Sequence, residues 1–182
     1  MDDSPVEKLK ETLFPEDGES TYAVLDGASC EELIDHLIEF EPEHCCLYAG
    51  ELEPDMEVVA PYLVLLERDH PFTEWLLANI LGKPWGIFAH SPADFRAMRK
   101  HFRTFLMVKG PDGESLYFRY YDPRVLSIYL PTTNKEERNT VFGPVSAYFC
   151  ETPTKEFTQY RHNEGQLQAL RTFKVPEITN AH

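Results

Sequence analysis

The hairpin signal within residues 105–121 constrains the fold more than any other part of the sequence. The turn Gly110-Pro-Asp-Gly113 separates two runs rich in apolar and aromatic residues. Asp-Gly between strand-like runs is typical of a β-hairpin, so we expect a strand on each side of the turn. Pro123 fixes φ and has no N–H, so the second strand must end there and a helix can begin, with Asp122 as its N-cap. The sequence therefore predicts a hairpin followed at once by a helix.

Charged residues within this segment need partners. Alternation along a strand places Tyr117, Arg119 and Tyr121 on one face. Arg119 must then be paired or lie in a groove that accepts a cation. We expect Arg119 and Asp122 to form a structural ion pair that holds the hairpin against the helix, which leaves Arg124 free to contact a partner. The alternative is that these charged groups bind phosphate or act in acid–base chemistry.

The remainder of the chain alternates strand-like and helix-like segments, and its 182 residues suit one domain with a substantial core. Strands are expected at 21–25, 45–49, 62–66, 85–89 and 145–150, and helices at 29–40, 73–81, 91–102 and 123–130. Ser29 and Ser91 are the expected N-caps of two of these helices. Residues 135–140 are expected to form a polar helix or a loop. Gly143 and Pro144 break the chain before the last of these strands. We expect an α/β (mixed α+β) fold: a single compact domain with a central mixed sheet, the hairpin and flanking helices.

The two ends of the chain are expected to lie outside this core, which spans residues 21–150. Residues 1–20 are polar and acidic, which is typical of a tail or a short helix. Residues 151–182 are also polar, and we expect a short helix or tail there.

Charge is distributed unevenly along the chain, which has a net charge of −14. Residues 1–58 contain 18 acidic and two basic residues, whereas residues 59–182 contain 13 acidic and 15 basic ones. This distribution argues against a general nucleic-acid binder, which needs a basic footprint. It suits either a solvated acidic face that maintains solubility or a surface for a basic protein partner. No apolar run is long enough to span a bilayer, and no secretory signal is visible, so we expect a cytoplasmic protein.

The chain lacks the common motifs of catalysis and metal binding. Phosphate-binding loops of the G-x-x-x-x-G-K-[ST] type, G-x-S-x-G and H-E-x-x-H do not occur. The four cysteines form no C-x-x-C pair, so we expect buried free thiols, and we expect neither a metal nor a cofactor. His44 beside Cys45 and Cys46 is the closest approach to a metal site. Asp26 follows a strand and precedes a helix, where catalytic carboxylates often lie, but we favour a turn in which Asp26 bonds its own backbone.

One helix is expected to carry the only strongly basic surface. Arg96, Arg99, Lys100 and Arg103 recur at i, i+3, i+4 and i+7, so they share one face of the helix. Such a face is solvated by default, and the alternative is contact with a partner.

Several short motifs occur in an order that resembles a bacterial family of type VI secretion adaptor chaperones (Tap or TEC effector-loading proteins). The series consists of Tyr22-Ala-Val-Leu-Asp-Gly27, Leu47-Tyr-Ala-Gly50, Ala60-Pro-Tyr-Leu-Val64, Trp75-Leu-Leu77, Trp85-Gly86, the helix 95–102, Pro111-Asp-Gly113, Phe118-Arg-Tyr-Tyr-Asp-Pro-Arg124 and Phe142-Gly-Pro144. The resemblance covers roughly residues 21–150. It implies a non-catalytic cytoplasmic protein that binds one secreted toxic effector and helps load it onto the VgrG or PAAR-type spike. It also implies that Arg119, Asp122, Pro123 and Arg124 form a family hallmark.

Two sets of site residues follow from this resemblance and from the residues themselves. The expected partner-binding residues are Arg96, Arg99, Lys100, Arg103, Tyr117, Tyr121 and Arg124. The expected structural residues are Asp26, Arg119, Asp122, Pro123, Gly143 and Pro144. We expect an apolar or amphipathic effector segment to bind, with the tyrosines as anchors. The competing hypotheses are an enzyme for a phosphorylated or acidic substrate, with Asp26 opposite the arginines, and an interaction module of an unrelated complex.

Overall fold

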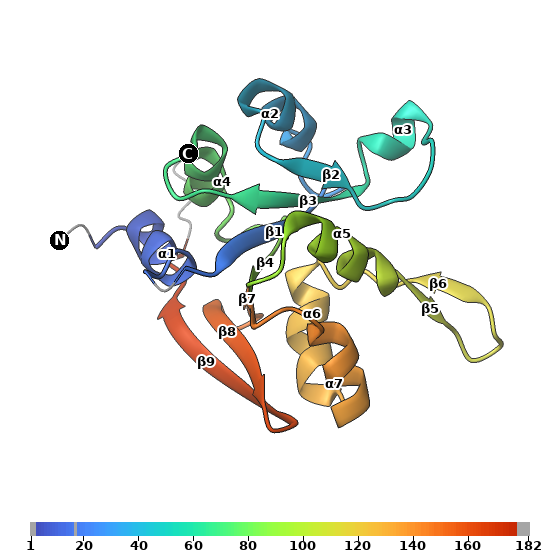
Figure 1. Cartoon of the computed structure of the whole chain (residues 1–182). Coiled ribbons are helices and arrows are strands. Elements are labelled where there is room, and N and C mark those ends of the chain that lie inside the picture. The colour runs from blue at the N-terminus through green and yellow to red at the C-terminus, as the bar shows by residue number, and fades with distance from the viewer. Residues whose placement is uncertain (1–2, 17, 178–182) are drawn as a thin grey trace.

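A seven-stranded sheet forms the centre of the molecule, with strand order β2-β3-β1-β4-β7-β8-β9 (Figure 1). The computed structural model describes residues 3–16 and 18–177. The strands of this sheet are β1 (Ser20–Asp26), β2 (His44–Cys46), β3 (Pro61–Leu66), β4 (Gly86–Ser91), β7 (Ala147–Glu151), β8 (Glu156–Asn163) and β9 (Gln166–Lys174). The expected hairpin is present as a separate two-stranded ribbon, β5 (Met107–Lys109) and β6 (Ser115–Tyr117), which projects from the body of the molecule.

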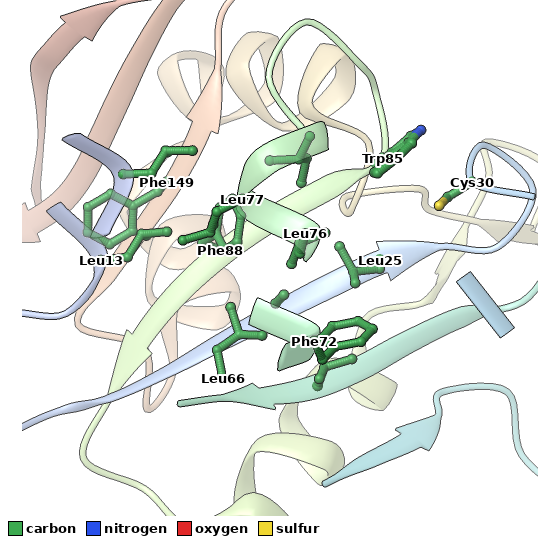
Figure 2. Close-up of a cluster of buried hydrophobic side chains, with 14 of the residues drawn as sticks. Leu13, Leu25, Cys30, Leu66, Phe72, Leu76, Leu77, Trp85, Phe88 and Phe149 are labelled. Carbon is green, nitrogen blue, oxygen red and sulfur yellow. The ribbon is translucent and has the colours of Figure 1, made fainter. Parts of the chain in front are cut away.

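Helices cover both faces of the sheet and create three layers. They are α1 (Pro5–Leu13), α2 (Leu33–Phe40), α3 (Pro54–Glu57), α4 (Pro71–Asn79), α5 (Phe95–Thr104), α6 (Pro123–Tyr129), a 3₁₀ turn (Leu130–Thr132) and α7 (Lys135–Phe142). Helices α1, α2 and α4 pack on one face, where Figure 2 shows Phe72, Leu76 and Leu77 of α4 among the strand side chains. Helices α5, α6 and α7 pack on the other face.

The side chains of β1 point alternately into two hydrophobic cores, one on each face of the sheet. Ala23 and Leu25 point into the core beneath α1, α2 and α4, whereas Tyr22 and Val24 point into the core beneath α5, α6 and α7. Successive side chains of a strand face opposite sides of the sheet, so a strand that is buried on both faces must be apolar throughout. This explains the continuous apolar run Tyr22–Leu25 within β1.

The expected α+β fold class is confirmed, with the sheet, the hairpin and the flanking helices in place. The sheet itself differs from the mixed sheet that we expected, because every neighbouring pair of described strands is antiparallel. Helix α4 does connect two strands of the same direction, β3 and β4. However, β1 lies between them and pairs antiparallel with each, so no parallel ladder forms.

Both ends of the chain contribute to the core, contrary to expectation. Leu9 and Leu13 of α1 are fully buried, so this helix is part of the core even though the surrounding sequence is acidic. The prediction of a short helix or tail after residue 150 is wrong, because β8 and β9 extend the sheet there and bury Phe157 and Tyr160. Strand β9 lies at the edge with most of its side chains in solvent, so its sequence is polar and lacks the apolar signal of a buried strand.

Two helices begin later than the sequence suggested. Ser91 ends β4, and Asp94 caps α5 by accepting a hydrogen bond from the Ala97 amide at 2.8 Å. Ser29 does not cap α2, because turns precede this helix, which begins at Leu33; the Ser29 hydroxyl donates to a carboxylate oxygen of Asp26 at 2.7 Å. The Ser91 hydroxyl accepts from the Ala93 amide at 3.1 Å and donates to the Pro144 carbonyl, so it stabilises the turn that precedes α5.

Candidate functional site

Asp26 ends β1 with its carboxylate buried in a turn and only 1% exposed. Its Oδ1 accepts a hydrogen bond from the Ala28 amide at 3.0 Å, and its Oδ2 accepts one from the Ser29 hydroxyl at 2.7 Å. The Asp26 amide donates to the Trp85 carbonyl at 2.7 Å. The interpretation of Asp26 as a turn residue that bonds its own backbone is therefore confirmed.

Gly27 allows this turn to lie directly against the neighbouring chain. Its amide donates to the Ala60 carbonyl at 2.9 Å. A Cβ atom at this position would lie 2.6 Å from the Val58 carbonyl oxygen and 2.7 Å from that of Ala60. Both neighbours are backbone atoms that cannot rotate away, so the position requires glycine. The close approach holds Asp26 at a defined place at the end of the sheet.

Arg119 neutralises the Asp26 carboxylate. Its Nη2 donates to Asp26 Oδ2 at 2.5 Å, and its guanidinium carbon lies 5.8 Å from the centre of the Tyr121 ring. Partial burial tends to lower the pKa of Arg119, but the Asp26 carboxylate outweighs this effect and the pKa is raised overall. The expected pairing of Arg119 with Asp122 is wrong. Among the described residues, no other cation pairs with the buried Asp26 carboxylate, so Asp26 pairs with the guanidinium of Arg119.

Asp122 pairs instead with Arg124, two residues further on. Asp122 is the N-cap of α6, as expected, and its Oδ1 accepts from the Arg124 amide at 2.9 Å. The Arg124 guanidinium reaches back to the same carboxylate, with Nε 3.0 Å from Oδ1 and Nη2 2.8 Å from Oδ2. The prediction that Arg124 is free is therefore wrong, although its side chain remains 66% exposed. Pro123 occupies the first turn of α6 and is buried, as its structural role requires.

The two tyrosines that we expected as exposed anchors differ completely in exposure. Tyr117 at the end of β6 is 62% exposed, whereas Tyr121 is 3% exposed. They do not share a strand face, because β6 ends at Tyr117 and the chain turns before Pro123. Burial raises the pKa of Tyr121, and the adjacent Tyr48 and Asp26 raise it further. Tyr121 is thus a core residue beside the ion pair, and only Tyr117 remains available to a partner.

Tyr117 borders an apolar groove between the hairpin and the segment that follows β2. This groove, called here the Tyr117 groove, has a volume of about 350 Å³. Its lining is formed by Leu47, Tyr48, Ala49, Leu52, Met56, Arg103, Leu106, Met107 and Tyr117. Met56 and Met107 are 41% and 44% exposed, although both are large apolar side chains. No sequence pattern indicates this groove, because its walls come from segments that are far apart in the chain.

The basic residues of α5 share one face, as predicted. Arg96, Arg99, Lys100 and Arg103 line a shallow concavity, and we call this surface the α5 basic face. None of the four forms an ion pair with another residue in the part of the chain that the structure describes. Arg103 also lines the Tyr117 groove, and its Nη2 donates to the Cys46 carbonyl at 2.9 Å. The two surfaces therefore meet at one residue.

Gly143 and Pro144 have structural contacts on the opposite side of α5. Gly143 follows α7 with φ +47°, and a Cβ there would lie 2.7 Å from the His101 ring. The Pro144 carbonyl accepts from the Ser91 hydroxyl at 2.7 Å. The motif thus joins the end of α7 to β4 and α5.

The described residues contain no group of three His, Cys, Asp or Glu side chains that could hold a metal ion. Burial raises the pKa of the thiols of Cys30, Cys45, Cys46 and Cys150, and all four cysteines are free. Among residues 3–16 and 18–177, no helix is both long enough and apolar enough to cross a membrane.

Comparison with known proteins gives one match. The model of a family described as a domain of unknown function (DUF4123) matches residues 21–140, which is more than half of the chain. The matched region runs from β1 to α7 and contains the two ion pairs, the Tyr117 groove and the α5 basic face. No curated protein and no solved structure matches the chain.

Proposed function

Because the chain belongs to the DUF4123 family, known as the type VI secretion effector-adaptor (Tec/Tap) domain, we propose that it is an adaptor for one secreted effector. In this proposal the protein acts in the cytoplasm without catalysing a reaction. It binds a toxic effector, keeps it soluble and helps to load it onto a VgrG or PAAR-type spike component.

The family match over residues 21–140 is the observation that carries this proposal. The arrangement of the buried carboxylates and their arginines within the match supports an adaptor over an enzyme. A site for a phosphorylated or acidic substrate would need Asp26 and Asp122 to face a common cavity with free arginines. Instead each carboxylate is buried and held by its own arginine, Arg119 or Arg124. Neither carboxylate lines the Tyr117 groove or the α5 basic face.

Exposed apolar surface beside unpaired positive charge also supports a protein partner. Interfaces are typically built around aromatic, methionine and arginine side chains, and these are the residues that gather around the Tyr117 groove. Electrostatic complementarity then guides association and selects the partner.

Co-expression with the effector encoded beside the gene for this chain would test the proposal. We expect the effector to be soluble and to co-purify with the adaptor, and to be largely insoluble without it. A spike protein from the same locus should join the complex in a three-component pull-down. An effector from an unlinked locus serves as the control and should neither bind nor gain solubility. Equal solubility of the cognate effector with and without the adaptor, together with no co-purification, would contradict the proposal.

A further inference from the structure

We propose that the Tyr117 groove and the α5 basic face together bind one amphipathic helix of the partner, with apolar residues in the groove and acidic residues against α5. The inference rests on the proposed function for the identity of the partner, which would be an effector. The nature of the bound segment follows from the surface itself.

The apolar half of the surface lies between two segments of distant sequence. One wall comes from the chain after β2 and from α3, with Leu52 and Met56, and the other comes from the hairpin, with Met107 and Tyr117. Tyr117 contacts Tyr48 across the groove, with ring centroids 5.5 Å apart. Methionine side chains are flexible and polarisable, so such walls can adapt to the apolar side chains of a bound helix.

The charged half lies directly beside it. Arg103 belongs to the α5 basic face and donates to the carbonyl of Cys46 at the end of β2, at 2.9 Å, so this face lies close to β2. The whole protein carries a net charge of −14, yet these four cations have no carboxylate partner among the described residues. Because unpaired positive charge attracts negative groups, the complementary segment is acidic.

Arg103 lies where the apolar and charged halves of the surface meet, and one of its hydrogen-bond donors has no acceptor among the described residues. Its Nη2 is used by the Cys46 carbonyl, but its Nε is buried and has no acceptor within residues 3–16 and 18–177. A buried donor without an acceptor is destabilising. A carboxylate that drew the guanidinium towards the groove would supply the acceptor at the junction of the apolar and basic surfaces.

The hydrogen bond from Arg103 to the Cys46 carbonyl also disfavours strand addition, another common mode of peptide binding. An extended segment could pair with the free edge of β2, but this strand has only three residues. The carbonyl of Cys46, at the end of β2, is already occupied by Arg103. Strand addition needs a run of free backbone groups, whereas a helix satisfies its own backbone and presents only side chains.

A pair of synthetic peptides can test the surface without knowledge of the effector. One 18-residue peptide would carry leucine at i, i+3, i+4 and i+7 with glutamate along the adjoining stripe, and the matched peptide would carry lysine in place of glutamate. Fluorescence anisotropy with the full chain should show that the glutamate peptide binds roughly tenfold more tightly or better, since three or four charge pairs each contribute modestly. Equal binding of the two peptides would overturn the inference.

Three double variants locate the binding surface. Arg99→Glu/Lys100→Glu should weaken binding of the glutamate peptide roughly tenfold, and Met107→Asp/Tyr117→Ser should weaken it at least as much. Arg161→Glu/Lys174→Glu makes the same charge change on β8 and β9 and should leave binding unchanged. Urea unfolding of each variant would show that it is folded. Wild-type affinity in both surface variants would overturn the inference. Sedimentation measurements that show wild type as a dimer and both surface variants as monomers would also overturn it, because a second copy of the chain would then occupy the surface.

The same variants separate this inference from the adaptor function. If the effector co-purifies with wild type and equally with both surface variants, the adaptor function stands and the surface is wrong. If the peptide results are as expected but no effector binds, the surface stands and the adaptor function is wrong.

Discussion

Arg119 donates to the buried carboxylate of Asp26 at 2.5 Å, although the two residues are 93 positions apart in the sequence. This ion pair attaches the segment after the β5–β6 hairpin to the end of β1. The Tyr117 groove has one wall on the hairpin, so the pair also stabilises the position of that wall.

The two halves of this ion pair should be energetically coupled. Arg119→Met leaves a buried carboxylate without a cation, and we expect a loss of about 2 kcal/mol in the free energy of unfolding, below the usual value for a buried pair because Arg119 is half exposed. Asp26→Asn should cost a similar amount. The double variant should cost about 1 kcal/mol less than the sum of the two, as measured by urea unfolding. If the losses of the two single variants add strictly in the double variant, the ion pair contributes nothing to the free energy of unfolding.

Asp122 and Arg124 should contribute unequally despite their bidentate pairing. Asp122→Ala removes the N-cap of α6 and should cost about 1–2 kcal/mol. Arg124→Ala removes only an exposed guanidinium and leaves the cap intact, so we expect a loss of less than about 1 kcal/mol. Urea unfolding of both variants gives the comparison, and equal losses would contradict it.

Gly27 should tolerate alanine much less well than Gly113 does. A Cβ at residue 27 would overlap two carbonyl oxygens, so Gly27→Ala must move the backbone and should cost about 3 kcal/mol or prevent folding. Gly113 has φ +79° and open space around it, so Gly113→Ala should cost only about 1–2 kcal/mol for the left-handed conformation. Thermal unfolding would rank the two, and a reversed order would be inconsistent with the close approach of Gly27 to the backbone of Val58 and Ala60.

His101 should make the protein less stable in acid. Burial lowers the pKa of His101 in the folded state to about 4, against 6.5 for an unperturbed histidine. Between these two values the unfolded chain binds a proton that the folded chain does not, so its contribution to stability is present above pH 6.5 and is lost progressively as pH falls towards 4. We expect this single group to account for roughly 3 kcal/mol across the interval.

The control for this prediction is His101→Gln, which removes the titration. Urea unfolding at several pH values gives the free energy of unfolding as a function of pH. Between pH 6.5 and pH 4 this free energy should fall less steeply for the variant than for wild type. The difference in slope should correspond to the binding of up to one proton. Parallel curves for wild type and variant would show that His101 does not contribute.

The last two strands should be essential for folding. A chain that ends at residue 151 lacks β8 and β9 and exposes the partners of Phe157 and Tyr160 in both cores. We expect this truncation to lose its cooperative urea transition. A chain that ends at Glu177 retains both strands and should unfold like the full-length protein. A cooperative transition in the shorter chain would show that residues 21–150 fold without the two strands.

The sequence indicated the local elements well and the long-range partners poorly. The Gly110–Gly113 turn, the Asp122 cap and the turn at Asp26 were all predicted, because each depends on groups within a few residues of one another. The partner of Arg119 was assigned to the nearest carboxylate in sequence, and the structure shows the distant one. Sequence proximity says little about which of two buried acids lacks a cation.

The α5 basic face and the Tyr117 groove show the same contrast within one surface. The spacing of Arg96, Arg99, Lys100 and Arg103 predicted that they share a helix face, because helical geometry depends only on the local chain. The groove beside them was not predictable, since it forms only when the hairpin packs near the segment after β2.

Residue spacing alone is therefore sufficient for the hairpin turn, the helix start at Pro123, the apolar strands and the shared face of the α5 cations, because short-range sterics and periodicity govern them. Tertiary packing decides the antiparallel order of the sheet, the inclusion of β8 and β9, the burial of Tyr121 and the pairing of Arg119 with Asp26. These features depend on contacts between residues that are distant in the chain, and their free energy depends on which groups become buried together.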